Sequence, residues 1–161
     1  MEKIFGLPAH PLLVHGPVVL VPLVALAAAL LALRPRWRHR YGPALAIAAG
    51  VVVIMTLLAA SSGEALQEAL QRTGATVAVR RHADLADMTK LIVIGMFFSV
   101  LGLVVSDRLS GRSVGAAASN RSIVLPTVFA ALTVLTAIAG TIWMIRTGHA
   151  GAEIVWSETL S

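Results

Sequence analysis

Three long runs without acidic residues, lysine or arginine constrain this chain more than any other feature. They are Pro11–Leu33, Pro43–Ser62 and Ile123–Ile145, of 23, 20 and 23 residues, and about 20 apolar residues are needed to cross the hydrocarbon of a bilayer. A fourth run, Leu91–Val105, reaches that length only if its helix begins further back, near His82. We therefore predict an all-α membrane protein, one four-helix domain over residues 1–161, with transmembrane helices at about 11–33, 43–62, 84–105 and 123–145.

The composition supports a membrane class and excludes several kinds of site. Of 161 residues, 57% are hydrophobic and 13% charged, which is too apolar for a soluble core of this size. The net charge of +5 would suit nucleic acid, but the basic residues lie between the apolar runs, so we predict a lipid bilayer as partner and no nucleic acid. Because there is no cysteine, disulfides, thiolate metal sites, iron–sulfur clusters and covalently attached haem are excluded.

Positive charge predicts the topology. The opposite side carries five lysines and arginines. Seven arginines follow the first and third runs: Arg34, Arg36, Arg38, Arg40, Arg108, Arg112 and Arg121. Because positively charged loops stay inside, we expect these connections in the cytoplasm and both termini outside it. Short connections favour an up-down-up-down bundle. Residues 64–72 are expected to form a short amphipathic surface helix.

Four of the five histidines fall at the predicted outer end of the bundle. His10 and His15 open the first helix, His82 opens the third, and His149 follows the fourth with Glu153 four residues later. Neutral imidazole binds zinc, copper, iron and haem iron, so these five residues are the candidate metal or haem ligands. His15 lies a full turn inside its apolar run, where an ionisable group usually faces the protein interior.

Neighbouring charged residues are candidates for supporting these ligands. A carboxylate that accepts a hydrogen bond from a ligating histidine orients its ring, and the candidates for this supporting shell are Asp84, Asp87, Glu64 and Lys90. A simpler interpretation also remains open, in which Asp87 pairs with Lys90 and the lysine reaches to the membrane surface. Equally, each histidine could serve only to cap or anchor a helix.

A weak internal duplication accompanies this pattern. Each half of the chain opens with a histidine, crosses the membrane, turns through a basic segment and crosses back. Each returning helix then ends in a small residue, a glycine and a nearby glutamate, in S62-G-E64 and A150-G-A-E153. The two halves would be parallel hairpins related by an axis along the membrane normal.

The opening string H10-P-L-L-V-H15-G-P17 resembles that of a bacterial integral-membrane family, domain of unknown function 2231, whose members begin like HPLLVHFP. Gly16 stands where the family usually has phenylalanine. Further likeness lies in S62-G63, in R81-H82-A83, and in G151-A-E153-I-V-W156, which is similar to the family's closing GGELVY.

The resemblance favours four site residues by matching position: His10, His15, His82 and Glu153. It implies a multi-pass protein in the inner membrane of a bacterium, and it supplies no established biochemical activity. Some relatives join such a membrane module to a Rieske-type iron–sulfur domain, which implies an electron-transfer setting. We expect no such domain in this chain, so a redox role would need a separate redox protein as partner.

Three functional hypotheses follow. The first is binding of b-type haem for electron transfer, with His15 and His82 as axial ligands and His10 and His149 as substitutes. The second is a non-haem transition-metal site for zinc, copper or iron, formed by His10, His15, His82 and Glu153. The third is a structural or assembly subunit without cofactor. Phosphate-loop, dinucleotide and zinc-protease motifs are absent, so we do not expect an independent enzyme; a homo-oligomer remains open.

Overall fold

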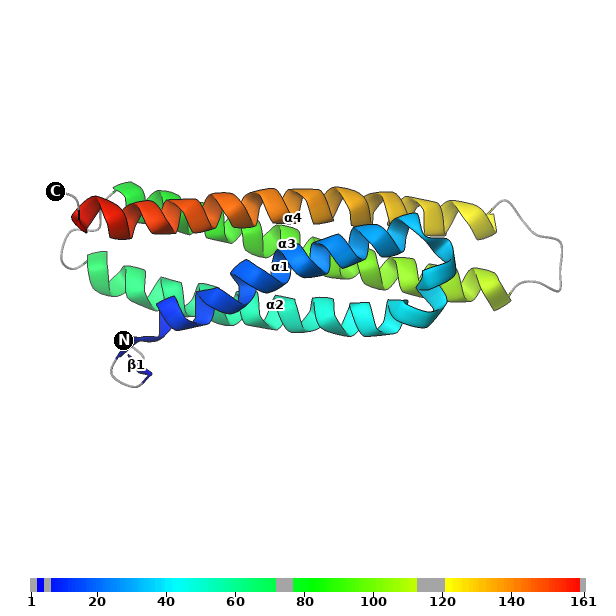
Figure 1. Ribbon diagram of the computed structural model, residues 1–161, viewed down its shortest axis with the longest axis horizontal. Helices are drawn as coiled ribbons and strands as arrows, with labels where there is room; N and C mark the ends of the chain where they lie inside the picture. Colours follow the sequence, from blue (N-terminus) through cyan, green and yellow to red (C-terminus); the bar gives the residue numbers. More distant parts are fainter. Residues whose placement is uncertain (1–2, 5–6, 72–76, 113–120, 160–161) are drawn as a thin grey trace.

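The computed structural model describes residues 3–4, 7–71, 77–112 and 121–159, and the side-chain surroundings of 10–68, 77–110 and 124–156. Four long helices account for nearly all of these residues (Figure 1): α1 (Ala9–Leu33), α2 (Pro35–Gln71), α3 (Val77–Arg112) and α4 (Arg121–Thr159). Before α1, the two-residue strands β1 (Lys3–Ile4) and β2 (Leu7–Pro8) pair antiparallel.

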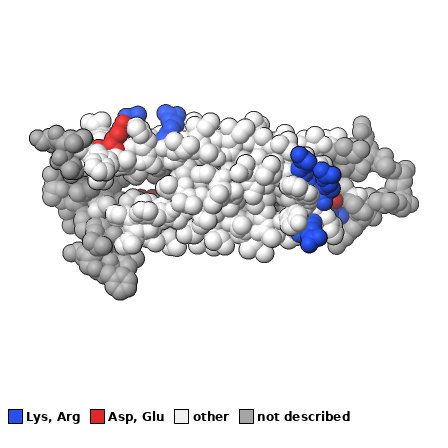
Figure 2. Space-filling model, viewed as in Figure 1, with Lys and Arg blue, Asp and Glu red and all other residues white. Residues whose placement is uncertain are grey.

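All four helices are long and apolar enough to cross a membrane, which confirms the predicted fold class. Large apolar side chains point outward around the bundle, among them Leu26, Ile47, Phe98 and Ile145. On the face drawn in Figure 2, charged side chains lie toward the two ends, and a band without them lies between. Exposed leucine and isoleucine belong against lipid tails, so this band is the membrane-facing surface.

The helices form a ring in chain order, in which α4 returns to pack against α1 and the diagonal pair α1 and α3 touch little. This arrangement is the up-down-up-down bundle that the short connections predict. Its core is made of small and medium side chains from all four helices, such as Val21, Val52, Val93 and Ala137.

Hydroxyl groups link α3 and α4 within the membrane-facing region. Ser99 Oγ lies 3.1 Å from Thr136 Oγ1, and Thr89 Oγ1 lies 2.8 Å from Thr147 Oγ1. Small polar residues allow helix backbones to approach closely and then hydrogen-bond across the interface, where no hydrophobic effect drives helices together.

The helices extend well beyond the predicted spans. The segment predicted as a separate surface helix at 64–72 continues α2 without a break as far as Gln71, and residue 72 lies outside the described residues. Likewise, α4 continues through Gly148 and Gly151 to Thr159. At about 1.5 Å per residue, the 37 residues of α2 measure about 55 Å, against about 30 Å of hydrocarbon. The ends of α2, α3 and α4 therefore stand outside the lipid.

A buried arginine makes the tight connection between α1 and α2. Only Arg34 separates the two helices. Arg38, in the first turn of α2, donates hydrogen bonds to the carbonyl oxygens of Leu31 and Ala32 at the end of α1, and its Nη1 lies 3.5 Å from Asp107 Oδ1 of α3. The last carbonyls of a helix lack partners within it, so one guanidinium satisfies the end of α1 and ties it to two neighbouring helices.

Candidate functional site

His10 projects from the first turn of α1 onto the end of α2. Its Nδ1 lies 3.0 Å from the carbonyl oxygen of Ala59 and 3.1 Å from Ser62 Oγ. A carbonyl oxygen can only accept, so Nδ1 carries the proton of the neutral ring and Nε2 keeps its lone pair. The ring lies against Gly63, where a Cβ atom would stand 2.9 Å from His10 Cε1.

His82 repeats this arrangement in the second half of the chain. It projects from α3 onto the end of α4, and its Nδ1 lies 3.0 Å from the carbonyl oxygen of Thr147. A Cβ atom at Gly151 would stand 3.1 Å from His82 Cε1. In both halves the glycine follows the accepting carbonyl by four residues, one helical turn. The two hairpins thus repeat one contact, as the internal duplication predicts.

The two histidines meet although they come from diagonally opposed helices. Their ring centroids are 6.3 Å apart and the ring planes are at 79°. Both side chains are partly buried. Among the described residues, neither Nε2 atom has a hydrogen-bond partner. The end of the bundle therefore presents two imidazoles with fixed tautomers and two available lone pairs.

His15 does not join this pair. Its side chain is exposed on the outside of α1, and its Nδ1 lies 2.6 Å from the carbonyl oxygen of Pro11 in the same helix. Successive residues turn by about 100° around a helix, so positions five apart face different ways. With His10 turned into the bundle, His15 faces outward.

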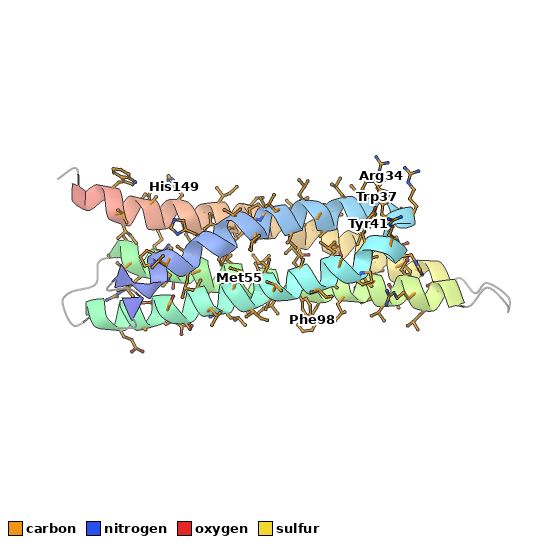
Figure 3. All side chains as sticks on the ribbon, turned by 60° about the horizontal axis from the view of Figure 1, so that its bottom comes forward. Arg34, Trp37, Tyr41, Met55, Phe98 and His149 are labelled. Carbon is orange, nitrogen blue, oxygen red and sulfur yellow. The ribbon has the colours of Figure 1, made fainter. Side chains whose placement is uncertain are left out.

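The remaining predicted ligands form a separate cluster on the surface. His149 Nε2 lies 3.2 Å from Glu153 Oε1, four residues on, and Arg81 Nη1 lies 3.8 Å from Glu153 Oε2. Figure 3 shows His149 on α4 near the end of the bundle that lies opposite Arg34. The carboxylate of Glu153 therefore contacts an arginine and an exposed histidine, and among the described residues no hydrogen bond or ion pair joins this cluster to the rings of His10 and His82.

Of the four predicted supporting residues, three form an ion-pair group between α2 and α3. Lys90 Nζ lies 2.8 Å from Asp87 Oδ1 and 3.6 Å from Glu64 Oε1, so the simpler pairing of Asp87 with Lys90 is present. The side chain of Asp84 is exposed. Among the described residues, backbone carbonyls rather than these carboxylates hold the two histidine rings.

Sequence reasoning missed the groups that hold the rings: the carbonyls of Ala59 and Thr147 and the bare surfaces of Gly63 and Gly151. The duplicated glycines were the available signal. Within the described residues, no group of three or more histidine, cysteine, aspartate or glutamate side chains is arranged to hold a metal ion. The site is therefore a pair of histidines, without a third protein ligand in that part of the chain.

Comparison with known proteins agrees with this architecture. The sequence pattern of a family described as a predicted membrane protein, DUF2231, matches residues 6–161. Searches of curated proteins and of solved structures find no match. Because the match covers nearly the whole chain and the four helices have the length and apolar character of membrane spans, the chain belongs to the DUF2231 family of membrane proteins.

Proposed function

We propose that this protein binds b-type haem between His10 and His82 and serves in electron transfer at one face of the membrane. The observation that carries the proposal is the meeting of two imidazoles from diagonal helices, neither of which has a hydrogen-bond partner for its Nε2 among the described residues. Helix bundles hold haem in this way, with ligands that project inward from facing helices.

The donor set fits haem iron. A histidine that binds a metal through one nitrogen usually donates its other N–H to a carbonyl or carboxylate, which fixes its tautomer and raises its basicity; His10 and His82 both do so. Metal–imidazole bonds are about 2 Å long, so two histidines can share one ion only when their ring centres are no more than about 6.5 Å apart. The observed separation is 6.3 Å.

In such a site the protein would hold the haem through the two histidines and set the orientation of their rings. Ala59 and Thr147 orient the rings, while Gly63 and Gly151 leave room for them against α2 and α4. Bound haem iron would supply the one-electron chemistry. The surroundings of His10 and His82 differ, because Ser62 Oγ approaches only the first. The partly buried position keeps the pair near the surface, within reach of a separate redox protein.

A single zinc, copper or iron ion is the alternative that the same pair supports, since imidazole suits all three metals. The set first predicted for such an ion, which adds His15 and Glu153, is not brought together: the side chain of His15 is on the outer face of α1, and Glu153 contacts Arg81 and His149. A bare ion would therefore rely on His10 and His82 for its protein ligands within the described residues.

The test is the visible spectrum of the purified protein, as isolated and after addition of haemin, together with elemental analysis. We expect a Soret band that shifts on reduction by dithionite, and its loss in His10→Ala and in His82→Ala. His15→Ala and His149→Ala are the matched controls and should keep the band. Stoichiometric metal without a Soret band would replace haem by the bare ion. A protein with neither haem nor metal, unchanged by His10→Ala, would overturn both and leave the histidines as links between helices.

A further inference from the structure

The corner between α1 and α2 carries exposed positive charge at the end opposite the histidine pair. Arg34, Arg36 and Arg40 are all exposed, and Trp37 and Tyr41 lie beside them. Figure 3 shows Arg34, Trp37 and Tyr41 together at this corner. The inward contacts of Arg38 fix the rotation of the first turns of α2 and so turn these neighbours outward.

These charges lack acidic partners in the part of the chain whose side chains are described. Among the described side chains at this end of the bundle, Asp107 is the one that is acidic, and it pairs with the buried Arg38. At the other end, five acidic side chains accompany four basic ones: Glu64, Glu68, Asp84, Asp87 and Glu153 with Arg80, Arg81, Lys90 and Arg146. Among the side chains that the structure describes, the positive charge of the corner is therefore uncompensated, while that of the opposite end is balanced.

The arrangement of the corner favours a bound anion. Arg36 and Arg40 are four residues apart in α2, so their like charges share a face and repel. Arg34 and Arg40 stack on the rings of Trp37 and Tyr41, with 5.9 Å and 5.6 Å from each guanidinium carbon to the ring centroid. Guanidinium groups bind phosphate through paired hydrogen bonds, which would relieve the repulsion.

The occupant must also match the surface next to the arginines. Leu33 is exposed beside Arg34, and in Figure 2 the basic side chains at this end border the uncharged, membrane-facing band. Tryptophan and tyrosine concentrate where lipid headgroups meet hydrocarbon. An occupant with a phosphate and an acyl tail matches both surfaces, whereas a free phosphate would leave the apolar side uncovered.

We propose that the α1–α2 corner binds the headgroup of an anionic phospholipid through Arg34, Arg36 and Arg40. This inference is independent of the proposed haem site, because the corner lies at the other end of the bundle and shares no residue with it. The lipid would add counter-charge to the corner and seat the basic end of the bundle in the headgroup layer of one leaflet.

The experiment reconstitutes the full chain into vesicles of equal parts phosphatidylcholine and phosphatidylglycerol, extracts it in mild detergent, and counts retained lipids by native mass spectrometry. We expect preferential retention of phosphatidylglycerol. A basic residue near an anionic surface changes binding by about fivefold, so Arg34→Gln/Arg36→Gln/Arg40→Gln should reduce that retention by about tenfold or more. The matched control Arg80→Gln/Arg81→Gln/Arg146→Gln removes the same charge at the other end and should retain the lipid.

Further outcomes decide the remaining points. The lysine triple Arg34→Lys/Arg36→Lys/Arg40→Lys keeps the charge and should retain an intermediate amount, which separates lost binding from lost folding. Equal loss of lipid in both glutamine triples would overturn the proposal, as would equal retention of the two lipids by the unaltered protein. Displacement of phosphatidylglycerol by inorganic phosphate would also overturn it, because the corner would then be a site for free anions.

Discussion

At the scale of single residues, the positions of the two site histidines depend on two neighbouring glycines as well as on hydrogen bonds. Each ring lies over a glycine of the neighbouring helix, and each Nδ1 donates to a carbonyl one turn before that glycine. A glycine inside a helix ordinarily costs stability, so its place at Gly63 and Gly151 is explained by the room that it leaves for an imidazole.

We predict that Gly63→Ala displaces the ring of His10. The added Cβ would stand 2.9 Å from His10 Cε1, and overpacking of this kind costs about 1–3 kcal/mol, more than the helix propensity that alanine gains. The free energy of unfolding in detergent should fall, and haem binding should weaken.

Gly148→Ala is the matched control, because a Cβ atom there meets nothing within 4 Å. It should stabilise the protein by about 0.5–1 kcal/mol through helix propensity alone. Equal stabilisation by the two alanines would show that the His10 ring is free to move away from Gly63.

At the scale of elements, the connection between α1 and α2 depends on Arg38. The side chain is buried and joins the end of α1 to α2 and, through Asp107, to α3. The connecting residue Arg34 donates its backbone N–H to the carbonyl oxygen of Leu31, and the guanidinium of Arg38 adds donors for the carbonyl oxygens of Leu31 and Ala32.

We predict that Arg38→Met lowers the free energy of unfolding by about 3 kcal/mol, since it removes the arginine partner of a partly buried carboxylate and the guanidinium donors to the carbonyl oxygens of Leu31 and Ala32. Arg36→Met, two residues earlier and exposed, should change it by less than about 0.5 kcal/mol. Chemical denaturation in mixed micelles measures both. Similar values for the two variants would contradict the assigned role of Arg38.

At the scale of the whole molecule, the bundle is polarised. Its basic end carries the exposed arginines of the corner, and its other end carries the histidine pair among balanced charges. The start of α1 and the end of α4 lie at the same end of the bundle (Figure 1), which is the end that carries the histidine pair. By the positive-inside rule, we propose that the basic end faces the cytoplasm and the histidine pair faces outward.

Single-cysteine labelling measures this orientation directly, because the chain has no cysteine of its own. We predict that His149→Cys reacts with a membrane-impermeant maleimide on intact cells, while Arg40→Cys reacts only after the cells are permeabilised. Both positions are exposed, so each should be reactive when accessible. Labelling of both from the same side would contradict a membrane-spanning arrangement, and the reverse pattern would invert the proposed orientation.

The sequence alone predicted the four spans, the bundle and the family, and it placed four histidines near one end. It did not predict the full helix lengths. Outside the lipid, a separate surface helix and the continuation of a transmembrane helix have the same sequence pattern, so the pattern cannot tell them apart. Residues 64–71 are the example: they continue α2.

By itself the sequence determined how the chain partitions between lipid and water, since that depends on the composition of each segment and on local charge. Only the tertiary structure decided which histidines meet. Because α1 is apolar on nearly every side, no polar stripe indicates which face turns inward. The rotation of α1 is set by close packing against its neighbours, which turns His10 toward His82 and His15 away.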